Sequence, residues 1–134
     1  MRKFKFRGRD LSTGKFVFGD LETRPKEDIM VIHQYNEDGS YKSQVKVDQN
    51  TVGQYVYSRH VPKDNCVREI FEGDILRGRQ PYEDGTHIGF VEYDERAQRY
   101  KLHTKGNHLE ELVVFSIVEI LGNIYDNPEI IENK

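Results

Sequence analysis

The nine residues from Arg68 to Leu76 read REIFEGDIL and place an acidic corner between two apolar pairs. Two interpretations compete: Glu72 and Asp74 form a carboxylate pair for acid–base chemistry or a metal, or the corner leads into a strand. Gly73 allows a bend there, and an aspartate beside it can accept hydrogen bonds from exposed backbone N–H groups. The local sequence supplies no nucleophile or base to complete a catalytic site. We therefore expect Glu72, Gly73 and Asp74 to be structural.

Apolar and polar residues alternate with a period of two on both sides of this corner, which is the pattern of half-buried strands. Phe4 and Phe6, then a Ser-Thr-Gly turn, then Phe16 and Phe18 predict a hairpin at the start of the chain. An Asp-Gly pair at 38–39 predicts another hairpin, because glycine adopts the positive φ that such turns need. The strand-like runs 41–47 and 51–58 follow it.

The segment 109–127 is the longest apolar stretch, and we interpret it as two short strands with a bend. Asn127-Pro128-Glu129 can start one helical turn. No long sequence repeat or low-complexity linker is visible. The fold prediction is therefore mainly all-β, with about nine or ten short strands, antiparallel hairpins and at most a short helical turn.

The domain prediction is a single domain, residues 1–134. It leaves room for two subdomains: an N-terminal sheet of β hairpins, 1–66, and a small barrel-like unit, 67–134. We expect the two subdomains to meet in the polar stretch from Ser58 to Arg68.

Composition limits the class of protein. Hydrophobic residues make up 36% of the chain and charged residues 32%, so the core is thin and burial in a homo-oligomer would stabilise it. A net charge of -3 argues against a protein that coats nucleic acid over its whole surface. No run of 18 apolar residues and no apolar signal core occur, and there is a single cysteine. We expect a cytoplasmic protein that does not cross a membrane.

Five stretches in order carry a family resemblance: FKFRGRDLSTGKFVFGDL, TVGQYV, IFEGDIL, GFVEYD and IVEILGNIYDNPEII. From Phe4 to Ile131 the chain resembles the YopX family, small proteins found largely in bacteriophages and prophages. The resemblance implies a mostly β fold and a phage or prophage origin, and it implies no particular activity. We take eight positions in these stretches as a structural motif: Gly53, Gln54, Tyr55, Glu72, Gly73, Asp74, Gly122 and Asn123.

The basic N-terminal strand is a candidate nucleic-acid site. Lys3, Lys5, Arg7 and Arg9 alternate with apolar residues, and strand residues two apart lie about 6.6–7 Å apart, close to the phosphate spacing of a nucleic-acid strand. Alternatively, the cations protect a sheet edge from pairing, or they contact acidic residues of a neighbouring subunit. We favour these alternatives.

The loop from Gly78 to Gly89 is the candidate partner-binding loop, because it combines aromatic and charged residues. Its candidate residues are Arg79, Tyr82, Glu83 and Asp84. An ordinary exposed loop is the simpler interpretation. The five histidines follow no metal-ligand spacing, so we expect no metal and no cofactor.

These observations favour a non-enzymatic phage or prophage accessory protein that binds protein, its own copies included. A nucleic-acid-associated protein that uses the basic strand is the alternative, possible but not favoured. A small enzyme with a carboxylate or histidine site is third.

Overall fold

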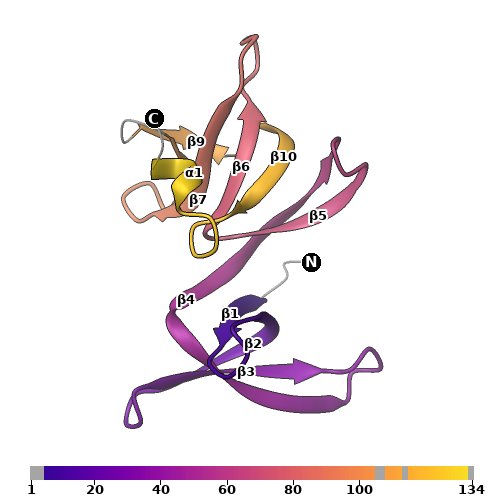
Figure 1. Cartoon of the computed structure of the whole chain (residues 1–134), viewed down its shortest axis with the longest axis vertical. Coiled ribbons are helices and arrows are strands. Elements are labelled where there is room, and N and C mark those ends of the chain that lie inside the picture. The colour runs from indigo at the N-terminus through magenta and orange to yellow at the C-terminus, as the bar shows by residue number, and fades with distance from the viewer. Residues whose placement is uncertain (1–4, 105–107, 113–114, 133–134) are drawn as a thin grey trace. The chain divides into compact units, whose positions relative to one another are not determined.

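The computed structural model describes residues 5–104, 108–112 and 115–132, apart from the side chains of residues 108 and 110. These residues form antiparallel strands and one short helix, which confirms the mainly all-β prediction (Figure 1). The chain divides into two compact units, Met1–Tyr55 and Val56–Lys134.

The first unit contains β1 (Phe6–Asp10), β2 (Phe16–Arg24), β3 (Ile29–Tyr35) and the first part of β4 (Tyr41–Val61). Each strand pairs antiparallel with the next, and β4 also pairs with β1, so the pairing closes on itself. The strand β4 changes partner at Val47, which pairs with a residue of β3 and with one of β1. The predicted hairpin at the start of the chain is β1–β2.

The strand β4 is longer than predicted, because the expected runs 41–47 and 51–58 join into one element. Polar residues at the junction bend the strand without ending it. The Thr51 hydroxyl donates to the Asp48 carbonyl at 2.7 Å and accepts the Arg9 N–H at 2.9 Å, and the register with β1 shifts beside Arg9. Such a shift is typical of a β-bulge, which bends a strand and keeps it paired.

The second unit contains the last part of β4 and the strands that follow it. These strands are β5 (Cys66–Phe71), β6 (Asp74–Arg79), β7 (His87–Asp94), β8 (Arg99–Thr104), β9 (His108–Glu111) and β10 (Ser116–Asn123). The end of β4 pairs with β5, and the other five form a sheet in the order β10-β6-β7-β8-β9. The predicted pair of short strands near the C-terminus corresponds to β9 and β10. The predicted helical turn corresponds to α1 (Glu129–Glu132).

The acidic corner connects β5 to β6. Gly73 has a φ of 91°, a conformation open to glycine at no steric cost, and its N–H donates to the Val91 carbonyl at 2.9 Å. The Asp74 side chain is buried and accepts the Phe71 N–H at 2.8 Å. Asp74 therefore holds a backbone turn together.

The apolar residues on both sides of the corner enter the core of the second unit. Eight buried side chains form this core: Val61, Ile70, Leu76, Val91, Leu102, Leu112, Phe115 and Ile117. Burial of such side chains contributes about 1.5–3 kcal/mol each before the entropic cost of ordering the chain. In the first unit the fully buried apolar side chains are Val31, Ile32 and Val47.

The two units repeat one arrangement of three strands, which the absence of a long sequence repeat did not indicate. Adding 70 to the residue numbers of β1–β3 reproduces the pairing of β6–β8. The pair Phe6 and Gly19 becomes Leu76 and Gly89. The pair Asp20 and His33 becomes Phe90 and His103.

The repeat includes several identical residues. Arg-Gly-Arg occurs at 7–9 and again at 77–79, and a glutamate and a histidine recur at the same separation in both hairpins. Gly19 and Gly89 recur because a Cβ at either position would collide with the backbone of the neighbouring strand. Few other residues are identical, so sequence periodicity alone did not reveal the repeat.

Candidate functional site

Cations and aromatic rings alternate on one face of the first sheet. Arg7 lies opposite Phe18 and Arg9 opposite Phe16, so these side chains point to the same face. The Arg7 guanidinium carbon lies 4.5 Å from the centroid of the Phe16 ring, and that of Arg9 lies 5.6 Å from it. Lys5 Nζ lies 5.6 Å from the centroid of Phe18. The rings thus stabilise the cations by cation–π contacts.

The predicted basic stripe is therefore only partly displayed to solvent. Lys3 lies outside the described residues, and Lys5, Arg7 and Arg9 share one face. Arg7 is only 6% exposed, whereas Phe18 is 40% exposed. A ligand approaching this face would meet aromatic carbon as well as positive charge.

A hydrogen-bonded polar cluster extends the same face across β2, β3 and β4. Glu22 Oε1 lies 2.6 Å from His33 Nε2, and His33 Nδ1 lies 2.9 Å from the Tyr41 hydroxyl. Arg24 donates from Nε to Glu22 Oε2 at 3.0 Å and from Nη2 to Gln44 Oε1 at 3.1 Å. Three strands and their register are needed to bring these five side chains together.

Hydrogen bonds from Arg24, and then from His33, lower the pKa of Glu22 from its ordinary 4.5 to about 2. Glu22 is therefore a carboxylate at neutral pH and can only accept hydrogen bonds. In the tautomer with the proton on Nε2, His33 donates to Glu22, and Nδ1 is then the acceptor of the Tyr41 O–H.

Two tyrosines complete the face. The rings of Tyr35 and Tyr41 contact edge to face with centroids 5.6 Å apart, and they are 49% and 53% exposed. Desolvation, followed by the nearby Asp20 carboxylate, raises the pKa of Tyr35. We call this surface the aromatic–basic face and define it by Lys5, Arg7, Arg9, Phe16, Phe18, Glu22, Arg24, His33, Tyr35 and Tyr41.

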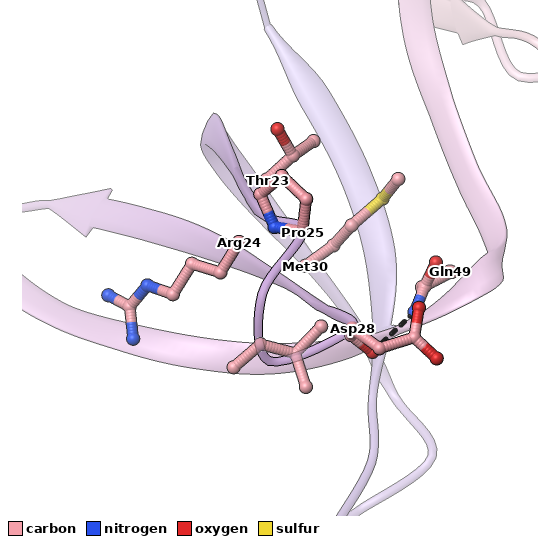
Figure 2. Close-up of a pocket in the computed structure, with 7 residues that line it drawn as sticks. Thr23, Arg24, Pro25, Asp28, Met30 and Gln49 are labelled. Carbon is pink, nitrogen blue, oxygen red and sulfur yellow. Dashed lines mark hydrogen bonds between the residues drawn. The ribbon is translucent and has the colours of Figure 1, made fainter.

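A shallow hollow of about 240 Å³ lies beside this face, at the β2–β3 turn (Figure 2). Gln49 donates to the Asp28 carbonyl at 2.7 Å across it, and the Arg24 side chain extends away from Met30 and Gln49. The Arg24 guanidinium is thus directed to Glu22 rather than into the hollow. Its lining is Thr23, Arg24, Pro25, Asp28, Ile29, Met30 and Gln49.

The candidate partner-binding loop is shorter than predicted, because its first residues, up to Arg79, belong to β6 and its last residues, from His87, belong to β7. Arg79 and Asp84 are exposed, and Tyr82 is fully exposed, with a φ of 68°. Glu83 Oε2 lies 2.7 Å from His87 Nε2. A role of this loop in binding a partner stays a prediction.

The positions of the predicted structural motif lie in turns and paired strands. Gly53 is buried opposite Arg7, and the Tyr55 N–H donates to the Lys5 carbonyl at 2.8 Å. Asn123 Oδ1 accepts the N–H groups of residues 125 and 126 at 3.0 and 2.9 Å, which shapes the turn before α1. Gln54 pairs with Phe6, Glu72 lies half-buried in the corner, and Gly122 has a φ of 145°.

Among the described side chains, no three from His, Cys, Asp and Glu are grouped so as to hold a metal ion. No described helix is long and apolar enough to span a membrane.

Sequence reasoning missed the cluster of Glu22, His33 and Tyr41, because it considered the histidines only for metal-ligand spacing. The cluster depends on the register of the β2–β3 hairpin, in which Asp20 lies opposite His33. That register places Glu22 diagonally across from the imidazole.

A family model described as "YopX protein" matches residues 5–132, nearly the whole chain. No curated protein and no solved structure matches the chain.

Proposed function

The chain belongs to the YopX family, and on this premise we propose that it is a non-enzymatic accessory protein of bacteriophage or prophage origin. It acts in the cytoplasm of the bacterial host by binding protein, and its own copies are the first candidate partner. The aromatic–basic face is the binding surface.

The observation that carries this proposal is the composition of the exposed part of that face. Phe18, Tyr35 and Tyr41 are 40%, 49% and 53% exposed, and they lie on the same face as Arg9 and Arg24. Aromatic residues and arginine are the side chains most enriched at protein interfaces and at their energetic hot spots. Cross-strand contacts already order several of these side chains, which lowers the entropy lost on binding.

Self-association is favoured because the face carries both signs of charge. Lys5 and Arg9 lie at one end of it, on and beside β1, and Asp20 and Glu22 lie further along β2. In a two-fold dimer the same patch meets itself, so its cationic end can face the acidic part of the partner copy. Burial of the aromatic rings would then add apolar area that the thin core lacks.

Light scattering tests the proposal. We expect a mass above 15.8 kDa at micromolar concentration, and a return to the monomer mass in the double variant Phe18→Ser, Tyr35→Ser. Tyr82→Ser is the matched control, since it removes a fully exposed aromatic ring outside the face and should leave the mass unchanged. A native monomer, or an oligomer indifferent to the double variant, contradicts self-association through this face.

Nucleic acid is the second candidate partner, and the alternation of Lys5, Phe18, Arg7, Phe16 and Arg9 favours it. Aromatic rings that stack on bases beside cations that contact phosphates are typical of single-strand binding proteins. Fluorescence anisotropy of labelled single-stranded oligonucleotides across a salt series tests this. Binding should weaken steeply with salt.

The half-buried cations Lys5 and Arg9 are the ones to reverse in that assay. Lys5→Glu combined with Arg9→Glu should abolish binding, whereas Lys26→Glu, on the β2–β3 turn, is the matched control. Arg7 is left intact because it is buried and its reversal would damage the fold. Absence of binding at low salt rejects this candidate.

A further inference from the structure

The side chains Glu22, His33 and Tyr41 are ordered as carboxylate, imidazole and hydroxyl. The two contacts on His33 use opposite ring nitrogens, with Nε2 at 2.6 Å from Glu22 and Nδ1 at 2.9 Å from the Tyr41 oxygen. Because Glu22 is ionised, it holds the tautomer that leaves the Nδ1 lone pair facing the Tyr41 O–H. A nucleophile, a base and a group that orients the base occur in this order in activated hydroxyl sites.

We propose that Tyr41 is an activated phenol, a modification site that accepts an acyl group from an electrophilic acyl donor with His33 as the general base. The Tyr41 oxygen attacks the carbonyl carbon of the donor, an oxygen–carbon bond forms, and the bond from that carbon to the leaving group breaks. The phenol proton passes to His33 Nδ1 and from there to the leaving group. The product is an aryl ester on Tyr41, and no electron is gained or lost overall.

Tyr41 lies on an exposed part of the first unit. Tyr41 lies at the start of β4 and is 53% exposed, while the His33 side chain is 22% exposed and held from two sides. The Tyr35 ring supports Tyr41 edge to face. Arg24 is held by Glu22 and Gln44, which fixes the carboxylate that orients His33.

A comparison with the second unit shows which of these contacts recur in the equivalent hairpin. Glu92 Oε2 lies 2.6 Å from His103 Nδ1, so the glutamate–histidine pair recurs 70 residues later. There the His103 ring stacks on Phe90 at 4.9 Å between centroids, and the residue opposite it on the next strand is Leu109. The glutamate–histidine pair is therefore common to both hairpins, but it uses His33 Nε2 in the first unit and His103 Nδ1 in the second.

Acetylation by N-acetylimidazole near neutral pH tests the proposal on the full chain, with the rate at each tyrosine followed by peptide mass spectrometry. Tyr82 is the internal standard, because it is fully exposed. Exposure alone predicts that Tyr41 reacts more slowly than Tyr82. General-base assistance predicts that Tyr41 reacts at least about tenfold faster.

Variants assign the effect to the imidazole. His33→Gln should lower the Tyr41 rate to that of Tyr82 or below, and an unchanged Tyr82 rate shows that the loss is local. His103→Gln removes the equivalent histidine of the second unit and should leave Tyr41 unaffected. A Tyr41 rate no higher than that of Tyr82 in the native protein overturns the proposal without any variant. An unchanged Tyr41 rate in folded His33→Gln does so as well.

Discussion

Gly89→Ala tests the pairing of β7 with β8 most directly. A Cβ on Gly89 would lie 2.5 Å from the carbonyl oxygen of His103 and 3.0 Å from Leu102 Cγ. Both neighbours are constrained, since the carbonyl belongs to the backbone of β8 and Leu102 is 1% exposed in the core. The overlap can be relieved only by moving one strand against the other.

Overpacking of this kind costs about 1–3 kcal/mol, and a contact with backbone rather than with a flexible side chain places Gly89→Ala at the upper end. A loss of about 3 kcal/mol is a large part of the usual 5–15 kcal/mol of stability. At a urea slope of about 2 kcal/mol/M it lowers the unfolding midpoint by about 1.5 M. Circular dichroism during urea titration measures this shift.

Gly85→Ala is the matched control, because a Cβ there meets nothing within 4 Å. Its free energy of unfolding should stay within about 0.5 kcal/mol of the native value. Gly19→Ala should resemble Gly89→Ala, since its Cβ would collide with the His33 carbonyl in the equivalent hairpin. Equal midpoints for Gly89→Ala and Gly85→Ala would refute the steric reasoning.

Two further predictions concern carboxylates. Asp74→Ala removes the acceptor of the buried Phe71 N–H and should lower the free energy of unfolding in urea by about 1–3 kcal/mol, with Asp74→Asn costing less because it retains an oxygen. Glu22, whose pKa falls from 4.5 to about 2 on folding, stabilises the native state above pH 4.5, and this contribution is lost as the pH falls toward 2. The difference in urea midpoint between native protein and Glu22→Gln should therefore shrink as the pH is lowered, and a difference independent of pH would contradict the assignment.

The three-strand arrangement recurs 70 residues further along the chain. Comparing the two copies distinguishes the residues that serve the shared fold from the residues that are particular to the first unit. Arg7 and Arg77 are equivalent, yet Arg7 packs on the Phe16 ring, whereas Arg77 pairs with the carboxylate of Glu119. The position equivalent to Phe16 is Thr86 in the second unit. The aromatic rings of the aromatic–basic face are thus additions to a shared framework, which is why the binding proposal rests on them.

The sequence by itself determined most of the strands and turns. Alternation with a period of two and turn residues such as Gly39 and Gly73 act over a few neighbouring residues, so they can be recognised without a partner strand. The Asp74 hydrogen bond to a nearby N–H is equally local.

Only the tertiary structure decided the register of the strands and the pairings beyond the predicted hairpins. Closure of β4 onto β1 and the burial of Arg7 depend on a hydrogen-bond ladder between strands distant in sequence, and the contact of His33 with both Glu22 and Tyr41 depends on the register of neighbouring strands. A shift of one residue in any ladder would turn each side chain to the other face. The repeat stayed hidden for the same reason, since it conserves registers and a few contacts rather than residue identities.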